Sequence, residues 1–352
     1  ASRGLGDVYK RQALGKRYAT LGSIESSSIL VVGGTGFVGS NLVKVLAEKG
    51  HDVVSLDIAP PNELVKQYLD PVSSRVEWVQ ADIADAVSLS NAIAGHAIDK
   101  IVHMAVYTAI QDEVERAHSR TVIDVNVVGT ANLLDFARDT SIGRFIYVGS
   151  GGSYAGSAIA PTDRPIHEDY PQIPKGLYSI TKYASELMTT RYGELHDFST
   201  AVVRIGGPYG PMERPTGHRA VMGVMCEWTG KAMRGEEIQV AERARGDFTY
   251  VLDIAEGIRV VLDASHLPHP VYNNTRGVGY NVDEVVEAFQ KALPSAKFVQ
   301  PVLKQSRTRA AGLSRPRLDS SRIQDLGMVY KYDLVSGVKA YMKWRSEFGE
   351  IA

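Results

Sequence analysis

The chain has 352 residues, 44% of them hydrophobic and 22% charged, and a formal net charge of −1 at pH 7. This nearly neutral balance gives no reason to expect nucleic acid or an anionic membrane as a partner, and no apolar stretch is long enough to span a bilayer. The single cysteine, Cys226, excludes an internal disulfide and favours a reducing compartment, which we take to be the cytoplasm.

The first 27 residues differ from the rest of the chain. They are rich in Arg and Lys and show little apolar periodicity. A secretory signal needs an apolar block after its basic part, and none is present. We interpret residues 1–27 as an extension outside the core fold, with a transit peptide as the alternative.

From Ile29 onward, short apolar runs alternate with segments that carry apolar residues three and four apart. This alternation predicts an α/β fold, a Rossmann-type doubly wound parallel sheet with helices on both faces. The helical segments include Ser40–Lys49 and Thr121–Arg138. The predicted strands are Ile29–Val32, Val53–Leu56, Val76–Val79, Ile101–Ala105, Phe145–Val148 and Ala201–Ile205.

After Ile205 the regular alternation ends in a segment rich in proline. A strand–helix unit returns at Phe248–Leu262, and a terminal helix is expected at Leu334–Trp344. We therefore expect a large cofactor-binding domain, residues 28–205 joined by 247–275. A smaller C-terminal substrate-binding lobe would consist of residues 206–246 and 276–346.

A glycine-rich turn joins the first strand to the first helix. Glycines at positions 33, 36 and 39 lack Cβ atoms, so the backbone of this turn can approach a pyrophosphate. The helix N-terminus, at Phe37 and Val38, offers N–H groups and a partial positive charge. Asp57 closes the second strand, where a carboxylate binds the adenosine ribose hydroxyls and repels a 2′-phosphate. Ile58 follows instead of an arginine, which predicts NAD rather than NADP.

The stretch "YSITK" places Tyr178 and Lys182 four residues apart in a helical pattern, and therefore on one face of a helix. A nearby ammonium favours the phenolate form of a tyrosine. Such a tyrosine can take a proton from a substrate hydroxyl while a hydride leaves the same carbon. The loop "SGGSYAG", which starts at Ser150, precedes this helix and follows a predicted strand.

The sequence resembles the extended short-chain dehydrogenase/reductases, specifically the NAD-dependent epimerase/dehydratase group, over roughly residues 28 to 346. The resemblance rests on seven ordered motifs: "GGTGFVG", "ADI" at Ala81–Ile83, "HMA" at His103–Ala105, "DVNVVGT" at Asp124–Thr130, "YSITK", "VRIGGPYGP" at Val203–Pro211 and "DFTYVLDIAEG" at Asp247–Gly257.

The resemblance implies which loop serine is catalytic. Matching the family's Val-Tyr-Gly tyrosine to Tyr154 puts Ser150 at the active position, whereas matching its glycine to Gly156 would put Gly151 there, which has no hydroxyl. Ser150, Tyr178 and Lys182 are therefore the expected catalytic set, and Ser153 is a further candidate for substrate contact.

By the same resemblance, further residues are expected around the cofactor. The adenine is held by Asp82 and Ile83, the pyrophosphate and ribose are lined by Met104, Ala105 and Val106, and Asn126 lies near the nicotinamide ribose. His103 is expected to be structural, and no metal is expected. The segments Thr121–Arg138 and Leu177–His196 resemble the helix pair through which the family often dimerises, so we expect a homodimer.

Several residues depart from the family pattern. Dehydratases of the family carry Asp-Glu where this chain has Gly151 and Gly152, which disfavours simple dehydration. Sugar-nucleotide epimerases usually carry Asn in the segment that matches Gly206-Gly207 of this chain. They also carry Arg in place of Gly246, although Arg245 and Arg243 lie nearby. The basic segment Lys304–Arg322 either receives an anionic substrate group or forms a solvated surface.

Together these features predict an NAD-dependent epimerase-type oxidoreductase that acts on a sugar, with a nucleotide sugar as the preferred small-molecule substrate. The alternative is a net dehydrogenase of a smaller polyol, sugar acid or hydroxy compound. A non-enzymatic NAD sensor is disfavoured because it would not need the proton-transfer set.

Overall fold

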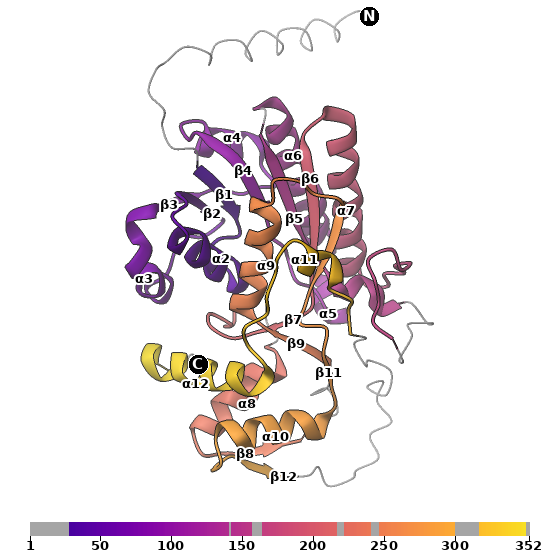
Figure 1. Cartoon of the computed structure of the whole chain (residues 1–352). Helices are drawn as coiled ribbons and strands as arrows, with labels where there is room; N and C mark the ends of the chain where they lie inside the picture. The colour runs from indigo at the N-terminus through magenta and orange to yellow at the C-terminus, as the bar shows by residue number, and fades with distance from the viewer. Residues whose placement is uncertain are drawn as a thin grey trace, which may run out of the picture.

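The computed structural model describes residues 28–140, 142–156, 164–216, 222–240, 246–299 and 317–349. The expected N-terminal extension, Arg243, Arg245 and most of the basic segment Lys304–Arg322 lie outside these ranges. A seven-stranded parallel sheet dominates the described part, with strand order β10-β6-β5-β4-β1-β2-β3 (Figure 1). The predicted fold class is confirmed. The strands are β1 (Ser28–Val32), β2 (Val53–Asp57), β3 (Val76–Gln80), β4 (Ile98–His103), β5 (Arg144–Ser150), β6 (Ser199–Ile205) and β10 (Val271–Asn274).

The order of the strands determines where a ligand can bind. From β1 the chain proceeds outward through β2 and β3, and then crosses back to β4 on the other side of β1. Loops after β1 and β4 therefore diverge, and they leave a crevice at the carboxyl ends of these two strands. The glycine-rich turn follows β1, and the segment Met104–Val106 follows β4, so both are at this crevice.

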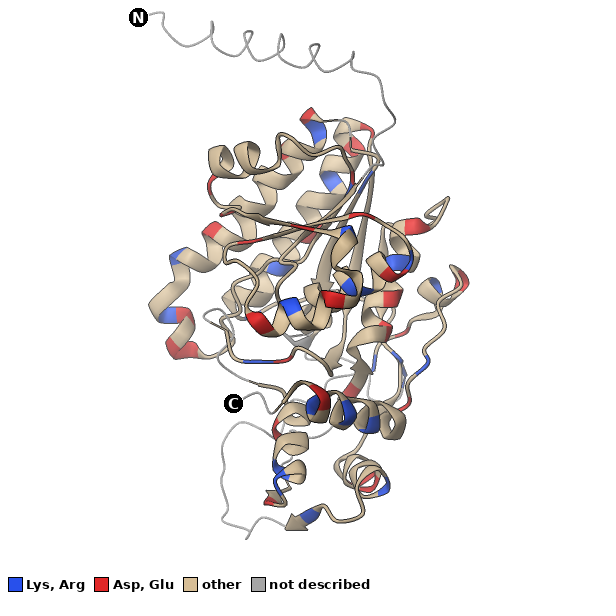
Figure 2. Cartoon of the chain, turned by 90° about the vertical axis from the view of Figure 1, so that its left-hand side faces the viewer, with Lys and Arg blue, Asp and Glu red and all other residues tan. Residues whose placement is uncertain are grey.

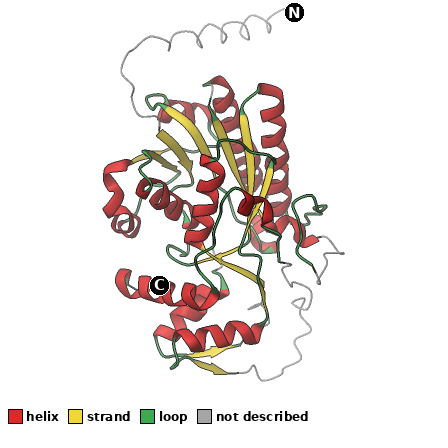
Figure 3. Ribbon diagram, viewed as in Figure 1, coloured by secondary structure: helices red, strands yellow, loops and turns green. Residues whose placement is uncertain are grey.

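Helices cover both faces of the sheet (Figure 3), and an apolar core lies on each face. Alternate residues of β1 belong to different cores: Ile29 and Val31 pack with α2 and α9, and Leu30 and Val32 pack on the other face. The first face is covered by α2 (Phe37–Glu48) and α9 (Val251–Asp263). The second face packs against α4 (Ala86–Ile93), α6 (Gly129–Asp139) and α7 (Leu177–His196).

One predicted helix is divided in the structure. The pattern over Thr121–Arg138 was expected to form a single helix, but α5 (Asp112–Ile123) is followed by a π-helical turn, Asp124–Val128, before α6 begins at Gly129. A Cβ atom on Gly129 would lie 2.6 Å from Cγ1 of Ile83, so glycine permits this close approach. The predicted strand Ile101–Ala105 also ends earlier, at His103, after which the Met104 N–H donates to Val32 O.

Most of the remaining elements form a smaller lobe beyond the carboxyl edge of the large sheet (Figure 1), whereas α11 packs against α9 and β10. Its three-stranded sheet has the order β11-β9-β7, and β8 pairs with β12. Helices α8, α10 and α12 pack around these strands. The bounds are β7 (Gly207–Tyr209), α8 (Val224–Met233), β8 (Glu237–Gln239), β9 (Gly246–Tyr250), β11 (Gly279–Tyr280), α10 (Val282–Ala292), β12 (Lys297–Val299), α11 (Ser321–Asp325) and α12 (Leu334–Phe348).

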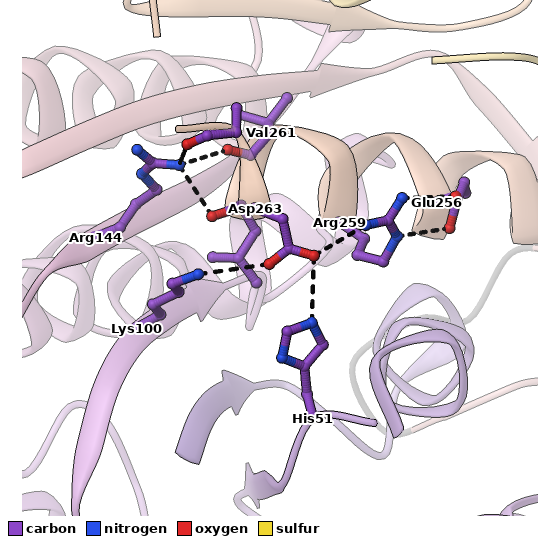
Figure 4. A network of polar contacts seen from close by, with 9 residues as sticks. His51, Lys100, Arg144, Glu256, Arg259, Val261 and Asp263 are labelled. Carbon is purple, nitrogen blue, oxygen red and sulfur yellow. Dashed lines mark hydrogen bonds and ion pairs between the residues drawn. The ribbon is translucent and has the colours of Figure 1, made fainter. Parts of the chain in front are cut away.

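A polar network fastens α9 to the amino-terminal edge of the large sheet (Figure 4). Arg144 of β5 donates to the carbonyls of Val261 and Leu262 at 3.1 and 3.0 Å, which satisfies acceptors that a helix C-terminus leaves unpaired. The Asp263 carboxylate accepts from Lys100 at 3.5 Å and from Arg259 at 2.9 Å. These contacts hold α9 on the large sheet.

Acidic and basic residues are interspersed along the ribbon in the view of Figure 2. Within the described ranges, no helix has the length and apolar character that crossing a membrane requires.

Candidate active site

The glycine-rich turn after β1 forms a backbone cradle. Gly33 has a φ of +87°, and a Cβ atom there would lie 2.8 Å from the backbone nitrogen of Ala105. A Cβ on Gly39 would lie 1.9 Å from the Gly33 carbonyl oxygen. Gly36 is the N-cap of α2 and has no side chain to cap the helix, and the first turn carries no acidic residue. This arrangement fits a dinucleotide pyrophosphate at the positive end of α2.

Asp57 lies beside this cradle at the end of β2. Its Oδ2 accepts hydrogen bonds from the backbone nitrogen and the hydroxyl of Thr35, at 3.1 and 2.7 Å. Its Oδ1 accepts from the Ile58 N–H at 2.8 Å. The carboxylate is therefore oriented by the glycine-rich turn itself, and it lies where a ribose diol of a bound dinucleotide is recognised in this fold.

The other expected cofactor residues follow β3 or β4 or lie in the π-helical turn before α6. Ile83 is buried against Gly129, and Asp82 accepts a hydrogen bond from the Ala84 N–H. Met104 is buried, whereas Ala105 and Val106 are partly exposed. Asn126 lies in the π-helical turn, where its side chain accepts from the Tyr107 N–H at 2.8 Å and donates to Thr181 Oγ1 at 3.0 Å. Its amide therefore links the loop after β4 to α7.

The loop after β5 distinguishes the two candidate serines. Ser153 is buried, and its hydroxyl donates to the Ser150 carbonyl at 2.7 Å, so its only proton donor is already used. The Ser150 hydroxyl instead accepts from the Gly152 N–H at 3.1 Å and keeps its own proton available as a donor. A Cβ on Gly151 would lie 2.8 Å from Cδ1 of Leu318, which fills the space beside this loop.

Lys182 is buried on α7, one helical turn after Tyr178. Its ammonium donates to the Val148 carbonyl at 2.6 Å and lies 4.4 Å from the centre of the Tyr147 ring. Burial lowers the pKa of Lys182 to about 7, although the nearby Glu186 carboxylate acts in the opposite direction. Tyr147, in β5, is a residue that the sequence analysis did not assign to the site.

A buried ion pair supports this face of α7. Glu186 lies one turn after Lys182, and its Oε2 accepts from Nε of Arg204 at 2.9 Å. Arg204 also donates to the Tyr154 hydroxyl and to the Glu168 carbonyl. Both members of the pair are buried. Neither residue was predicted from the sequence. Two signals were available: Arg204 is a charged residue within the apolar run of β6, and Glu186 follows Lys182 by four positions on one face of α7.

The N-terminus of α7 is capped by a residue from another helix. Gly176, its N-cap, provides no side-chain cap, and the Leu177 N–H donates instead to Oε1 of Glu115 on α5 at 2.8 Å. This contact fixes the first turn of the helix, which carries Tyr178. The two residues are 62 positions apart, so no local sequence pattern could reveal it.

His103 is fully buried and contacts Thr130 Oγ1 at 2.9 Å. Burial, together with the charge of Lys182, lowers the pKa of His103 to about 3, so the imidazole is neutral at physiological pH. Across the described ranges there is no cluster of three or more metal-ligating side chains.

Another residue that the sequence analysis missed is Arg214, in the segment after β7. Its Nη2 donates to the Thr35 carbonyl at 2.7 Å, so a guanidinium lies next to the residue that orients Asp57. Burial lowers the pKa of Arg214 and the Asp57 charge opposes this effect.

The fold and the site define a Rossmann-type, dinucleotide-dependent oxidoreductase. Two features at the carboxyl ends of one parallel sheet are typical of this class: a glycine-rich turn that admits a pyrophosphate, and a tyrosine–lysine pair. The sequence matches the NAD dependent epimerase/dehydratase family over residues 29–273, and the chain belongs to that family. The resemblance to extended short-chain dehydrogenase/reductases is confirmed, as is the expected cofactor, NAD.

The chain is similar over most of its length to curated and solved proteins. A putative UDP-glucose 4-epimerase of Methanocaldococcus jannaschii is 27% identical over 319 residues, which covers 90% of this chain and 97% of that protein. The dTDP-D-glucose 4,6-dehydratase of Mus musculus is 28% identical over 330 residues, 90% of this chain and 88% of the other. A solved UDP-glucose 4-epimerase of Thermotoga maritima, at 22% identity, has a similar fold with a TM-score of 0.76 and covers 91% and 99% of the two chains.

Proposed function

We propose that this enzyme is an NAD-dependent epimerase that acts on a nucleotide sugar. The observation that carries the proposal is the contact of the Lys182 ammonium with the Val148 carbonyl of β5, the strand that ends at Ser150. Tyr178 precedes Lys182 by one turn on the same helix, and the glycine-rich turn is suited to NAD. Similarity to UDP-glucose 4-epimerases over about nine-tenths of the chain supports the substrate class.

The chemistry requires a proton acceptor and a polarising donor at one hydroxyl-bearing carbon. When bound, NAD supplies the hydride acceptor and later the hydride donor. Tyr178 takes the proton of the substrate hydroxyl, and Lys182 favours the phenolate because an ammonium and a phenolate stabilise each other. The Ser150 hydroxyl donates a hydrogen bond to the reacting oxygen. Tyr178 then returns the proton to the oxygen of the ketone, and the carbon is inverted because the hydride returns to the other face of that ketone.

Elimination of water is disfavoured by the loop after β5. Gly151 and Gly152 have no side chain that could transfer a proton, and Leu318 packs where a side chain at position 151 would extend. This supports epimerisation over dehydration, although dehydratases are among the similar proteins.

One feature favours a second candidate, a net dehydrogenase of a smaller hydroxy compound. Gly246, which replaces the arginine of sugar-nucleotide epimerases, has a φ of +140°, a conformation that an arginine would adopt only with strain. A Cβ on Gly206 would also lie 2.3 Å from Cγ2 of Thr275. The diphosphate clamp of this chain must therefore differ from the usual one, or the substrate has no diphosphate.

The proposal extends to a homodimer. The helices α5 to α7 expose several large apolar side chains to solvent, an unusual surface for a monomer. They are Ile123, Val128, Ile180, Leu187 and Leu195, which are 39 to 54% exposed. Sedimentation or light scattering at micromolar concentration should give twice the chain mass, and a stable monomer would contradict this part of the proposal.

Thermal-shift titration with saturating NAD and then UDP, GDP or dTDP tests the substrate class. A ligand at a hundred times its dissociation constant stabilises the native state by about 2.7 kcal/mol. A shift with one nucleotide selects the sugar nucleotides in which to look for epimerisation. If no nucleotide raises the melting temperature and NADH accumulates with small hydroxy compounds, the dehydrogenase is correct.

The catalytic assignment is tested by Tyr178→Phe. We expect turnover to fall by about a hundredfold or more with NAD affinity nearly unchanged, because the substitution removes only the acid/base hydroxyl. Tyr183→Phe is a matched control on the same helix. Full activity of Tyr178→Phe would refute the proposed mechanism.

A further inference from the structure

A cation and a carboxylate approach the same residue of the glycine-rich turn. Asp57 binds the nitrogen and hydroxyl of Thr35, whereas Arg214 donates to the carbonyl of Thr35 at 2.7 Å. Arg214 is anchored further by its own segment, since Nη1 donates to the Met212 carbonyl at 3.2 Å. The two charged groups come from β2 and from the chain after β7, which are 157 positions apart in sequence.

The opposite charges have opposite effects on a dinucleotide. A carboxylate at the end of β2 binds the ribose 2′-hydroxyl and repels a 2′-phosphate, and an arginine at this place accommodates the phosphate. Arginine has five N–H donors in a planar fork that matches phosphate geometry. Arg214 is only partly buried, and the two bonds described above engage two of its donors.

We propose that Arg214 is a cofactor-specificity residue, and that its guanidinium would pair with a 2′-phosphate if Asp57 were uncharged. Exclusion of NADP therefore depends on the Asp57 charge and not on the lack of a phosphate partner. This inference rests on the proposed function, in which Asp57 binds the adenosine ribose. With Asp57 ionised, the two groups offset each other, and a 2′-phosphate gains little from Arg214.

The same contacts allow a purely structural role, in which Arg214 only ties the segment after β7 to the glycine-rich turn. The two roles differ in what they predict for cofactor choice. A structural tie affects NAD and NADP equally, because both require the same turn. A specificity residue affects NADP selectively, and only when the Asp57 charge has been removed.

The test measures the dissociation constants of NAD and NADP by calorimetry for the wild type, Asp57→Asn, Arg214→Gln and the double variant. We expect Asp57→Asn to bind NADP about 10 to 100 times more tightly than the wild type. This factor corresponds to one charge-assisted hydrogen bond, gained between Arg214 and the 2′-phosphate. The double variant should lose the part of this gain that comes from Arg214. Arg214→Lys combined with Asp57→Asn should keep part of it, because the charge remains without the planar fork.

Arg75→Gln is the matched control. It removes the same charge from an arginine that contacts the Gly50 carbonyl and Asp52, at the opposite end of β2 from Asp57. It should leave both dissociation constants unchanged. Melting temperatures of all variants verify folding.

Equal NADP affinity of Asp57→Asn and the double variant would overturn the inference, as would an equal loss of NAD and NADP affinity in Arg214→Gln. Failure of the wild type to bind NAD would instead overturn the proposed function itself. The two failures are therefore distinguishable in one experiment.

Discussion

Lys182 should make the folded protein less stable at neutral pH, and its replacement by methionine should stabilise the fold while it abolishes turnover. The ammonium is buried, so folding removes it from water. This desolvation lowers its pKa from 10.5 to about 7. A base whose pKa is lower in the folded state binds protons more weakly there, so folding is disfavoured at any pH below the unfolded pKa.

The size of the effect follows from that pKa change. One pKa unit corresponds to about 1.4 kcal/mol, so the lowering destabilises the native state by about 5 kcal/mol below pH 7. Methionine has a similar shape without the charge, but it leaves the Val148 carbonyl unpaired, which costs about 1–3 kcal/mol. It also loses the contact with the Tyr147 ring, worth about 1–2 kcal/mol. We therefore expect a net gain of about 0–3 kcal/mol, and the midpoint of this range corresponds to about 2 °C in melting temperature.

The assay is thermal unfolding of wild type and Lys182→Met from about pH 6 to about pH 9, with turnover measured in parallel. The penalty in the wild type diminishes as pH rises from 7 toward 10.5, because the unfolded chain then also loses its proton. The advantage of the variant should therefore shrink by about 3 kcal/mol across this range and change sign. Lys100→Met, which removes a partly exposed lysine paired with Asp263 at 3.5 Å, is the control and should not stabilise the protein.

Two results would refute this reasoning. A variant less stable than the wild type at about pH 6 would mean that the Val148 and Tyr147 contacts outweigh desolvation. A stability difference independent of pH would mean that Lys182 has the same pKa in the folded and unfolded states.

Two further predictions concern the residues that support α7. Glu115→Ala should lower kcat about tenfold and destabilise the protein by about 1–2 kcal/mol, because the Leu177 N–H loses its cap at the helix end that carries Tyr178. Glu115→Gln keeps an acceptor and should restore most of the kcat and most of the stability. An unchanged kcat in Glu115→Ala would exclude the positioning role. Arg204→Met should reduce the urea-unfolding free energy by about 3–5 kcal/mol because it leaves the Glu186 carboxylate buried without its partner. The double variant Arg204→Met/Glu186→Leu should recover much of this loss. Equal losses in both variants would show that packing, and not the unpaired charge, is responsible.

Local periodicity determined much of this protein. Short, nearly continuous apolar runs identified the strands, because strands of a parallel sheet are buried on both faces. The helix predicted over Leu177–His196 has those bounds in the structure. The glycine spacing identified the turn after β1, since only glycine fits a position where a Cβ would meet backbone atoms at less than 3 Å. These signals lie within short stretches of the sequence, so a single sequence is enough to identify them.

The tertiary structure alone decided which distant residues act at the site. Glu115 caps α7, Leu318 fills the space beside Gly151, and Arg214 approaches the glycine-rich turn next to Asp57. The prediction of NAD was correct, but it considered only Asp57 and the residue that follows it in the sequence. The arginine beside this carboxylate belongs to a segment far along the chain. Sequence spacing determines which side chains share a helix or strand, whereas the packing of separate elements determines which charges meet across the site.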